Sequence, residues 1–206
     1  IVALDKTGTI TEGLPRVTNI LPAAGVTEEE LLKLALSLEQ CSEHPLAKAI
    51  VTRAAEEHIQ ADTAENFQAL PGNGLRGIRE GHAVLGGSLR FMSAKTTVPD
   101  DIRAQAENLA GQGKTPLLFA EDGNLRGCIA VADPIKADSA EAIQQLKQMD
   151  IQVVMLTGDN ERTAQAIGQE AGVDRVIAGV LPDGKEQVIR SLCQQGKTIM
   201  VGDGIN

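Results

Sequence analysis

The last third of the chain alternates short apolar runs with helical patterns, in which apolar residues recur every three or four positions. The expected helices are 138–149, 161–171 and 183–195, and the expected strands are 151–156, 176–178 and 197–201. Asp138 and Ser139 are candidate caps for the first of these helices. Strands that alternate with helices in this way form a parallel sheet with crossover helices, so this part is predicted to be an α/β unit.

The middle of the chain has a different pattern, in which two helices precede short strands separated by turns. Thr27 and Glu30 form a capping box before the first helix, and Pro45 suits the first turn of a second helix that runs toward His58. A third helix is expected at 99–110, and strands are expected at 67–70, 75–78, 83–86, 116–120 and 125–132. This pattern favours antiparallel hairpins and an α+β unit.

The order of these patterns predicts one domain inserted into another. An isolated strand pattern at 1–4 precedes the α+β segment, and the α/β pattern follows it. We therefore expect an α+β domain at 14–130 inserted into an α/β domain formed by 1–13 and 131–206, with Glu12–Gly13 and Asp133–Pro134 as hinge strands. The chain begins inside an apolar run without an initiator Met and stops just after a loop. We expect it to be a piece of a longer protein, with the α/β domain truncated at its C-terminal side.

Charge and composition argue against several classes of protein. The 206 residues carry a formal net charge of -9, which disfavours a nucleic-acid backbone or an anionic membrane surface as the main partner. No run approaches the roughly 20 apolar residues that a membrane helix needs. Cys41, Cys128 and Cys193 are scattered, which indicates neither a disulfide framework nor a zinc site. A globular protein in a reducing compartment fits these features.

Reactive or phosphate-binding residue types follow several of the expected strands. They are Asp5 after 1–4, Thr157-Gly158-Asp159 after 153–156, Lys185 after 180–182 and Gly202-Asp203-Gly204 after 198–201. Open parallel sheets bind ligands at the carboxyl ends of their strands, so we expect these residues to converge at one edge of the sheet.

The converging residue types suit phosphoryl transfer. Two carboxylates together with phosphate oxygens form the kind of site that Mg²⁺ prefers. A lysine offsets the charge of the transferring phosphoryl group, and glycines let backbone N–H groups approach it. Each piece alone is also compatible with a polar turn, a helix cap or a solvated lysine. Their joint placement at strand ends favours the chemical interpretation.

Four strings in the chain carry a family resemblance: DKTGT at 5–9, TGDN at 157–160, LPDGK at 181–185 and GDGIN at 202–206. Their order and spacing over the whole chain resemble those of the P-type ATPases. The resemblance implies an α/β, haloacid-dehalogenase-like Rossmannoid phosphorylation domain. It also implies that the inserted α+β domain, with an antiparallel sheet, binds the nucleotide.

The same resemblance implies roles for individual residues. Asp5 would be the phosphorylated nucleophile, and Asp203 and the backbone carbonyl of Thr7 would hold Mg²⁺ beside it. The residues implied to bind the phosphoryl group are Thr157, Gly158 and Lys185, and those implied to bind or support the cofactor are Asp159 and Asn206.

Thr7 separates a pump from a phosphatase of the same superfold. Such phosphatases usually carry a second Asp two positions after the nucleophile, which acts as general acid and then activates water. A threonine hydroxyl cannot do that work near neutral pH. We therefore expect an aspartyl phosphate at Asp5 to persist, as a pump requires.

A second set of strings, SEHP at 42–45 and GNG at 72–74, narrows the resemblance. With Glu39 before them, they are similar to the nucleotide-binding domain of heavy-metal (P1B) pumps. By this likeness Glu39 and His44 would face the adenine of ATP, and Gly72 and Gly74 would admit the nucleotide because they lack side chains. A neutral imidazole can stack on a purine and exchange hydrogen bonds with it. Without the resemblance, the strings are also compatible with a plain helix start and a hairpin turn.

Within the heavy-metal pumps, the chain looks closest to bacterial copper-exporting members. The resemblance implies ATP and Mg²⁺ as cofactors and the membrane helices and actuator domain of the same pump as partners. It implies no nucleic acid, a monomeric piece, and a location at the cytoplasmic face of the cell (inner) membrane. Met92, Met149 and Met200 are interpreted as packing residues, not as copper ligands. A zinc or cadmium pump, a haloacid-dehalogenase-type phosphatase and a nucleotide sensor without catalysis stay open as alternatives.

Overall fold

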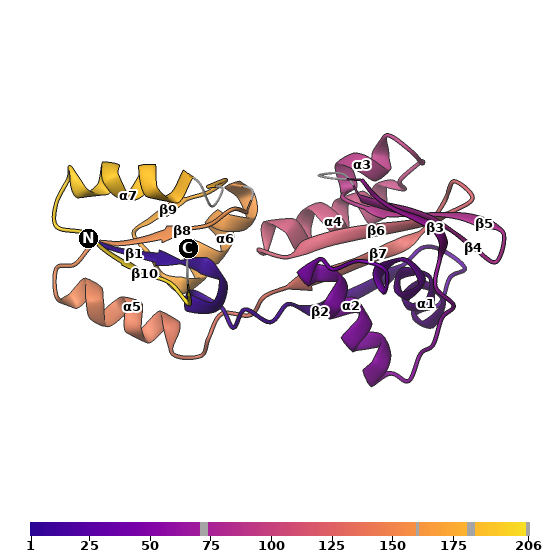
Figure 1. Ribbon diagram of the computed structural model, residues 1–206, viewed down its shortest axis with the longest axis horizontal. Coiled ribbons are helices and arrows are strands. Elements are labelled where there is room, and N and C mark those ends of the chain that lie inside the picture. The colour runs from indigo at the N-terminus through magenta and orange to yellow at the C-terminus, as the bar shows by residue number, and fades with distance from the viewer. Residues whose placement is uncertain (71–73, 160, 181–183, 205–206) are drawn as a thin grey trace. The chain divides into compact units, whose positions relative to one another are not determined.

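The chain divides into two compact units (Figure 1). The computed structural model describes residues 1–70, 74–159, 161–180 and 184–204. The first unit consists of Ile1–Leu14, Gly111–Gly113 and Asp133–Asn206, and the second of Pro15–Ala110 and Lys114–Ala132. None of the helices within the described ranges is long and apolar enough to cross a membrane.

The first unit is built on a parallel sheet. Its strand order is β10 (Ile199–Val201), β1 (Val2–Asp5), β8 (Val153–Leu156) and β9 (Arg175–Ile177). The central strands β1 and β8 are buried along their whole length, which explains their continuous apolar sequence. In their register Asp5 pairs with Leu156, so both strands end at the same edge of the sheet.

Helices cover both faces of this sheet. They are α5 (Ser139–Gln148), α6 (Glu161–Ala171) and α7 (Lys185–Cys193). Val2 and Leu4 share a buried cluster with Ile143 of α5 and Ile167 of α6, whereas Ala3 lies in a second cluster with Leu192 of α7. Because side chains alternate along a strand, α5 and α6 pack on one face and α7 on the other. The predicted α/β architecture is confirmed.

Two details predicted for α5 are wrong. Asp138 makes no capping hydrogen bond with its side chain, because its backbone is already helical (φ −95°, ψ −9°) and a capping residue needs an extended one. Ser139 turns inward instead, and its hydroxyl donates to the carbonyl of Ile10 over 2.8 Å. Met149, expected to pack, is 68% exposed.

The second unit is built on a six-stranded antiparallel sheet. The strand order is β2 (Arg16–Pro22), β7 (Asn124–Ala132), β6 (Thr115–Glu121), β5 (His82–Gly87), β4 (Gly74–Arg79) and β3 (Glu65–Leu70). The edge strand β2 escapes the sequence pattern because it is only half buried and its pairing with β7 is irregular between Val17 and Asn19. The predicted antiparallel sheet is confirmed.

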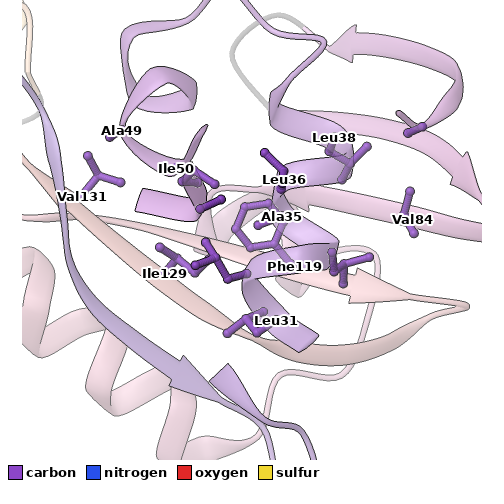
Figure 2. Packing of buried hydrophobic residues seen from close by; sticks show 14 residues of the cluster. Leu31, Ala35, Leu36, Leu38, Ala49, Ile50, Val84, Phe119, Ile129 and Val131 are labelled. Carbon is purple, nitrogen blue, oxygen red and sulfur yellow. The ribbon is translucent and has the colours of Figure 1, made fainter. Parts of the chain in front are cut away.

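Two pairs of helices accompany this sheet. They are α1 (Glu28–Glu39), α2 (Pro45–Glu56), α3 (Leu89–Ser93) and α4 (Asp100–Gly111). The capping box of Thr27 and Glu30 is present as predicted. Leu31, Ala35 and Leu38 of α1 form one core around Phe119 (Figure 2). The adjacent Leu118 lies in another core with residues of α3 and α4, on the opposite face of the sheet.

Removing the central ring of this core should weaken the second unit. Phe119 is fully buried, and its ring also fills the space beside Gly86, where a Cβ would lie 2.8 Å from the ring. We expect Phe119→Ala to cost about 3–5 kcal/mol. Amide hydrogen exchange in β5, β6 and β7 measures this loss. The exposed strand residue Glu65 provides a control, since Glu65→Ala should change stability by less than about 0.5 kcal/mol. Equal exchange in both variants would contradict the packing described.

Candidate active site

The carboxylate of Asp5 lies at the end of β1, where the chain turns sharply. Its Oδ1 accepts the N–H of Lys6 over 2.9 Å, and the carbonyl of Lys6 accepts the N–H of Thr11 over 3.0 Å. The turn 6–10 includes Gly8 at φ +73°, a conformation that side chains other than glycine rarely adopt. Asp5 is only 6% exposed, so its charge needs a partner.

That partner is Lys185, the first residue of α7. Its Nζ lies 2.6 Å from Oδ2 of Asp5, and the two side chains are 14% and 9% exposed. The positive end of the α7 dipole adds to the stabilisation of negative charge at this place. A carboxylate from the first residues of the chain thus meets an ammonium group about 180 positions later.

The loop after β8 forms a second wall of the site. Thr157 is buried, and its backbone bonds to Ile177 and Val180 on the neighbouring segment. The hydroxyl oxygen of Thr157 accepts the N–H of Asp159 over 3.1 Å, which leaves the hydroxyl proton to donate to another group. The carboxylate of Asp159 lies 2.8 Å from Nζ of Lys6. Lys6 is therefore neutralised within the site and does not compete with Lys185 for Asp5.

The loop after β10 brings Asp203 against the turn at Gly8. A Cβ added to Gly8 would lie 2.4 Å from Oδ2 of Asp203 and 2.9 Å from its Cβ. Only glycine allows this approach, so the DKTGT and GDG strings are complementary in shape. The carboxylates of Asp5 and Asp203 then border the same hollow.

This hollow is a pocket of about 360 Å³ within the first unit. It is lined by Asp5, Thr7, Thr157, Gly158, Asp159, Val180, Lys185 and Asp203. All predicted catalytic and metal-binding residues thus lie together, while Asn206 and most of the LPDGK string lie outside the described residues.

The donor set of this pocket fits Mg²⁺. In the described part of the chain no cluster of three or more His, Cys, Asp or Glu side chains could hold a metal by itself. Mg²⁺ does not require such a cluster, because it is bound through one or two carboxylates and completes its shell with water and phosphate oxygens. Asp5 and Asp203 supply two carboxylates, and Thr7 lines the same pocket.

A second pocket of about 800 Å³ lies within the second unit. It is bordered by the C-terminal end of α1, the N-terminal end of α2 and the sheet. Most of its wall is apolar and comes from β3, β4, β5 and β6, and its polar groups include Glu39 and His44. Gly74 also lines it, but a Cβ there would come 2.2 Å from the carbonyl of Gly86, so this glycine is needed for strand packing as well. The other predicted glycine, Gly72, lies outside the described residues.

His44 is held in one orientation by the start of α2. Its Nδ1 accepts the N–H of Leu46 over 3.2 Å, so the ring itself caps the helix. In the neutral imidazole the proton then lies on Nε2, which makes that nitrogen a donor. The exposed ring borders the pocket with its orientation already fixed.

Glu39, the last residue of α1, is the buried acid of this pocket. It is 6% exposed, and no hydrogen bond or ion pair to its carboxyl group is found among the described residues. Burial away from water raises the pKa of Glu39 to about 7, because desolvation penalises the charged form.

Comparison with known proteins identifies the family. The family model for haloacid dehalogenase-like hydrolases matches residues 1–206. The chain belongs to this family. Copper-transporting ATPase 2 of Rhizobium meliloti (strain 1021) is 43% identical over 100% of this chain, which covers 25% of that relative. The silver exporting P-type ATPase of Salmonella typhimurium is 41% identical, again over 100% of this chain and 25% of the relative.

A solved structure agrees with these relatives. The crystal structure of a zinc-transporting PIB-type ATPase in its E2.Pi state matches with a TM-score of 0.78 and 41% identity, over 98% of this chain and 33% of that one. The resemblance to heavy-metal P-type ATPases that the motifs indicated is confirmed. This haloacid dehalogenase-like chain spans about a quarter of the length of the curated relatives it matches.

Sequence reasoning missed a set of residues that fix the catalytic turn of this haloacid dehalogenase-like fold. Nζ of Lys136 donates to the carbonyl of Gly8 over 2.5 Å, and the backbone N–H of Lys136 donates to the carbonyl of Ile10. Asp133 accepts the hydroxyl of Thr11 over 2.6 Å and the N–H of Leu14 over 3.1 Å. The signal in the sequence was the position of these two charged residues, Asp133 within the expected hinge strand and Lys136 shortly after it.

The fit between Gly8 and Asp203 can be tested against a second glycine. Gly172 has a similar φ of +80°, but nothing lies within 4 Å of a Cβ built there. Alanine at either position should cost about 1–2 kcal/mol for the left-handed backbone. Only Gly8→Ala should displace Asp203. We expect the Mg²⁺ concentration for half-maximal thermal stabilisation to rise at least about tenfold in Gly8→Ala. The same midpoint in both variants would contradict a role for Asp203 in the metal site.

Proposed function

We propose that the chain is the ATP-binding and autophosphorylating module of a heavy-metal-translocating P-type ATPase. Asp5 attacks the γ-phosphate of ATP, a bond forms between its carboxylate oxygen and phosphorus, and ADP leaves. The observation that carries this proposal is the convergence of Lys185, Thr157 and Asp203 on the buried carboxylate of Asp5. Asp5, Thr157 and Asp203 lie at the ends of β1, β8 and β10, and Lys185 begins α7. All four groups have a role in phosphoryl transfer.

Each of these groups has a distinct task in the proposed reaction. Lys185 orients Asp5 through the 2.6 Å contact and offsets the charge of the incoming phosphoryl group. The hydroxyl proton of Thr157 and the N–H of Gly158 are proposed to donate to phosphoryl oxygens. Asp159 holds Lys6, and Asn206 is proposed to support the same loop.

Mg²⁺ would be held by Asp5, Asp203 and the carbonyl of Thr7. When bound, it neutralises charge on the phosphate oxygens and so allows two anions to approach each other. Burial leaves only 6% of Asp5 exposed, and the position of Thr7 offers no carboxylate to activate a hydrolytic water. Both features favour a lasting aspartyl phosphate over the rapid turnover of a phosphatase.

The larger pocket of the second unit is proposed to take the adenine of ATP. Its volume and largely apolar wall suit a planar base, and Glu39 and His44 provide the polar contacts. His44 presents a fixed Nε2–H and a ring face for stacking. Gly72 and Gly74 are proposed to leave room for the nucleotide. On this basis residues 14–130 form the nucleotide-binding domain, and 1–13 with 131–206 form the phosphorylation domain.

The transported ion is proposed to be Cu⁺, exported from the cell. The support is the similarity to relatives that are named copper-transporting or silver exporting pumps. The partners of the module are then the membrane helices and the actuator domain of the same pump. The module is proposed to lie at the cytoplasmic face of the cell membrane.

Phosphorylation should depend on the carboxylate of Asp5. In the full-length pump that carries this chain, Asp5→Asn should abolish acid-stable phosphoprotein formed from γ-labelled ATP, because an amide is not a nucleophile. Asp138→Asn is a matched control, since Asp138 is exposed, lies outside both pockets and makes no capping contact. Unchanged labelling of Asp5→Asn would refute the assignment. Labelling stimulated by Zn²⁺ and not by Cu⁺ would instead identify a zinc or cadmium pump.

The affinity for ATP should depend on His44, whereas the fold should not. His44→Gln keeps a side-chain acceptor near the start of α2 but removes the aromatic face and the fixed Nε2–H. We expect the Kd for ATP, measured by calorimetric titration, to rise about tenfold, as stacking contributes roughly 1–3 kcal/mol per base. Circular dichroism should show an unchanged fold. An unaltered Kd would remove His44 from the site.

A further inference from the structure

Glu39 occupies an unusual place for an acidic side chain. It is buried, it borders a largely apolar pocket, and its carboxyl group has no partner within the described part of the chain. An ionised carboxylate in such a place carries a large desolvation cost that nothing here offsets. The neutral acid avoids this cost.

The position of Glu39 on its helix also favours the neutral form of the acid. It is the last residue of α1, where the carbonyl ends of the helix give a negative potential. The other titratable groups around the pocket are Cys41, Glu43 and His44, all from the segment that follows α1. Strands β3, β4, β5 and β6 contribute no charged side chain to the wall among the described residues. Among the described residues that line the pocket, no lysine or arginine is therefore present to hold Glu39 in its ionised form.

The neutral acid has a hydrogen-bonding pattern that the carboxylate lacks. A protonated carboxyl group offers one O–H donor beside one C=O acceptor, whereas the carboxylate offers acceptors only. Adenine presents its N6 amino donor next to a ring nitrogen acceptor on either accessible edge. The two patterns are complementary only when the carboxyl group is protonated.

We propose that Glu39 binds the adenine of ATP as a neutral carboxylic acid, donating its O–H to a ring nitrogen while its C=O accepts the N6 amino group. The inference rests on the proposed function, because it takes the pocket of the second unit as the adenine site. Where Glu39 is ionised in the empty pocket, one proton is taken up from solvent when ATP binds. Glu39 thereby makes ATP affinity depend on pH.

The pH range follows from the raised pKa of Glu39, which lies at about 7. Below this value the acid is already protonated, and adenine binds without proton uptake. Above it, each unit of pH lowers the protonated fraction, and thus the ATP affinity, about tenfold. Burial also raises the pKa of the Cys41 thiol, so this group stays neutral over the range.

The test compares the wild-type chain with Glu39→Gln, whose amide permanently carries one donor and one acceptor. ATP is titrated calorimetrically without Mg²⁺ at about pH 6 and about pH 8, and the fold of each variant is checked by circular dichroism. Ionisation of the triphosphate affects both proteins equally and cancels in the ratio of their Kd values. We expect this ratio, wild type over Glu39→Gln, to rise about tenfold between the two conditions. Glu29→Gln, an exposed change on the same helix, should follow the wild type.

A constant ratio would overturn the proposal, as would loss of ATP binding in a folded Glu39→Gln at about pH 6. A second measurement needs no variant at position 39. Titrations at about pH 8 in buffers of different ionisation enthalpy should show uptake of about one proton per ATP bound to the wild type. Absence of uptake would also overturn the proposal. If the wild type binds no ATP at either pH, the nucleotide pocket itself is wrong; ATP binding without these pH effects refutes only the role given to Glu39.

Discussion

The ion pair between Asp5 and Lys185 is the contact on which the rest of the first unit depends. It joins the end of β1 to the start of α7 over 2.6 Å in a place that water hardly reaches. A buried carboxylate without such a partner would be strongly destabilising. The pair therefore fixes where α7 begins relative to the sheet, and it leaves the carboxylate facing a pocket rather than packed inside the core.

Other contacts of the first unit keep this carboxylate in position. Lys136 and Ser139 hold the carbonyls of the turn that follows Asp5, and Asp159 neutralises the neighbouring Lys6. The missing side chain of Gly8 lets Asp203 approach. The two lysines nearest Asp5 thus each have an acidic partner, Asp159 for Lys6 and Asp5 itself for Lys185, which is how these ionisable side chains can share a small, partly buried volume.

Much of this arrangement could be predicted because parallel strands impose it. Once 1–4, 153–156 and 198–201 are read as parallel strands, their carboxyl ends must meet at one edge, and the residues that follow them must converge. The contacts of Lys136 and Asp133 could not be predicted in this way. These contacts join two chain segments that are more than a hundred residues apart in sequence. The segments are polar and have no hydrophobic periodicity, so their sequence does not indicate that they lie side by side.

The remaining differences have similar causes. The edge strand β2 is half polar because only part of it is buried, and Asp138 fails as a cap because the chain enters α5 already helical. The burial of Glu39 depends on α2 and the sheet closing over the end of α1, which a helical pattern cannot reveal. Sequence patterns thus indicate where elements and strand ends lie, whereas the protonation of a single buried acid follows from packing.

The most direct test of the central claim is to locate the phosphate chemically. The pump that carries this chain is incubated with ATP, Mg²⁺ and the transported metal, quenched in acid, reduced with borohydride and digested for mass spectrometry. Borohydride converts an aspartyl phosphate to homoserine. The account predicts homoserine at position 5 and at no other aspartate; an unmodified Asp5 beside homoserine elsewhere would contradict it.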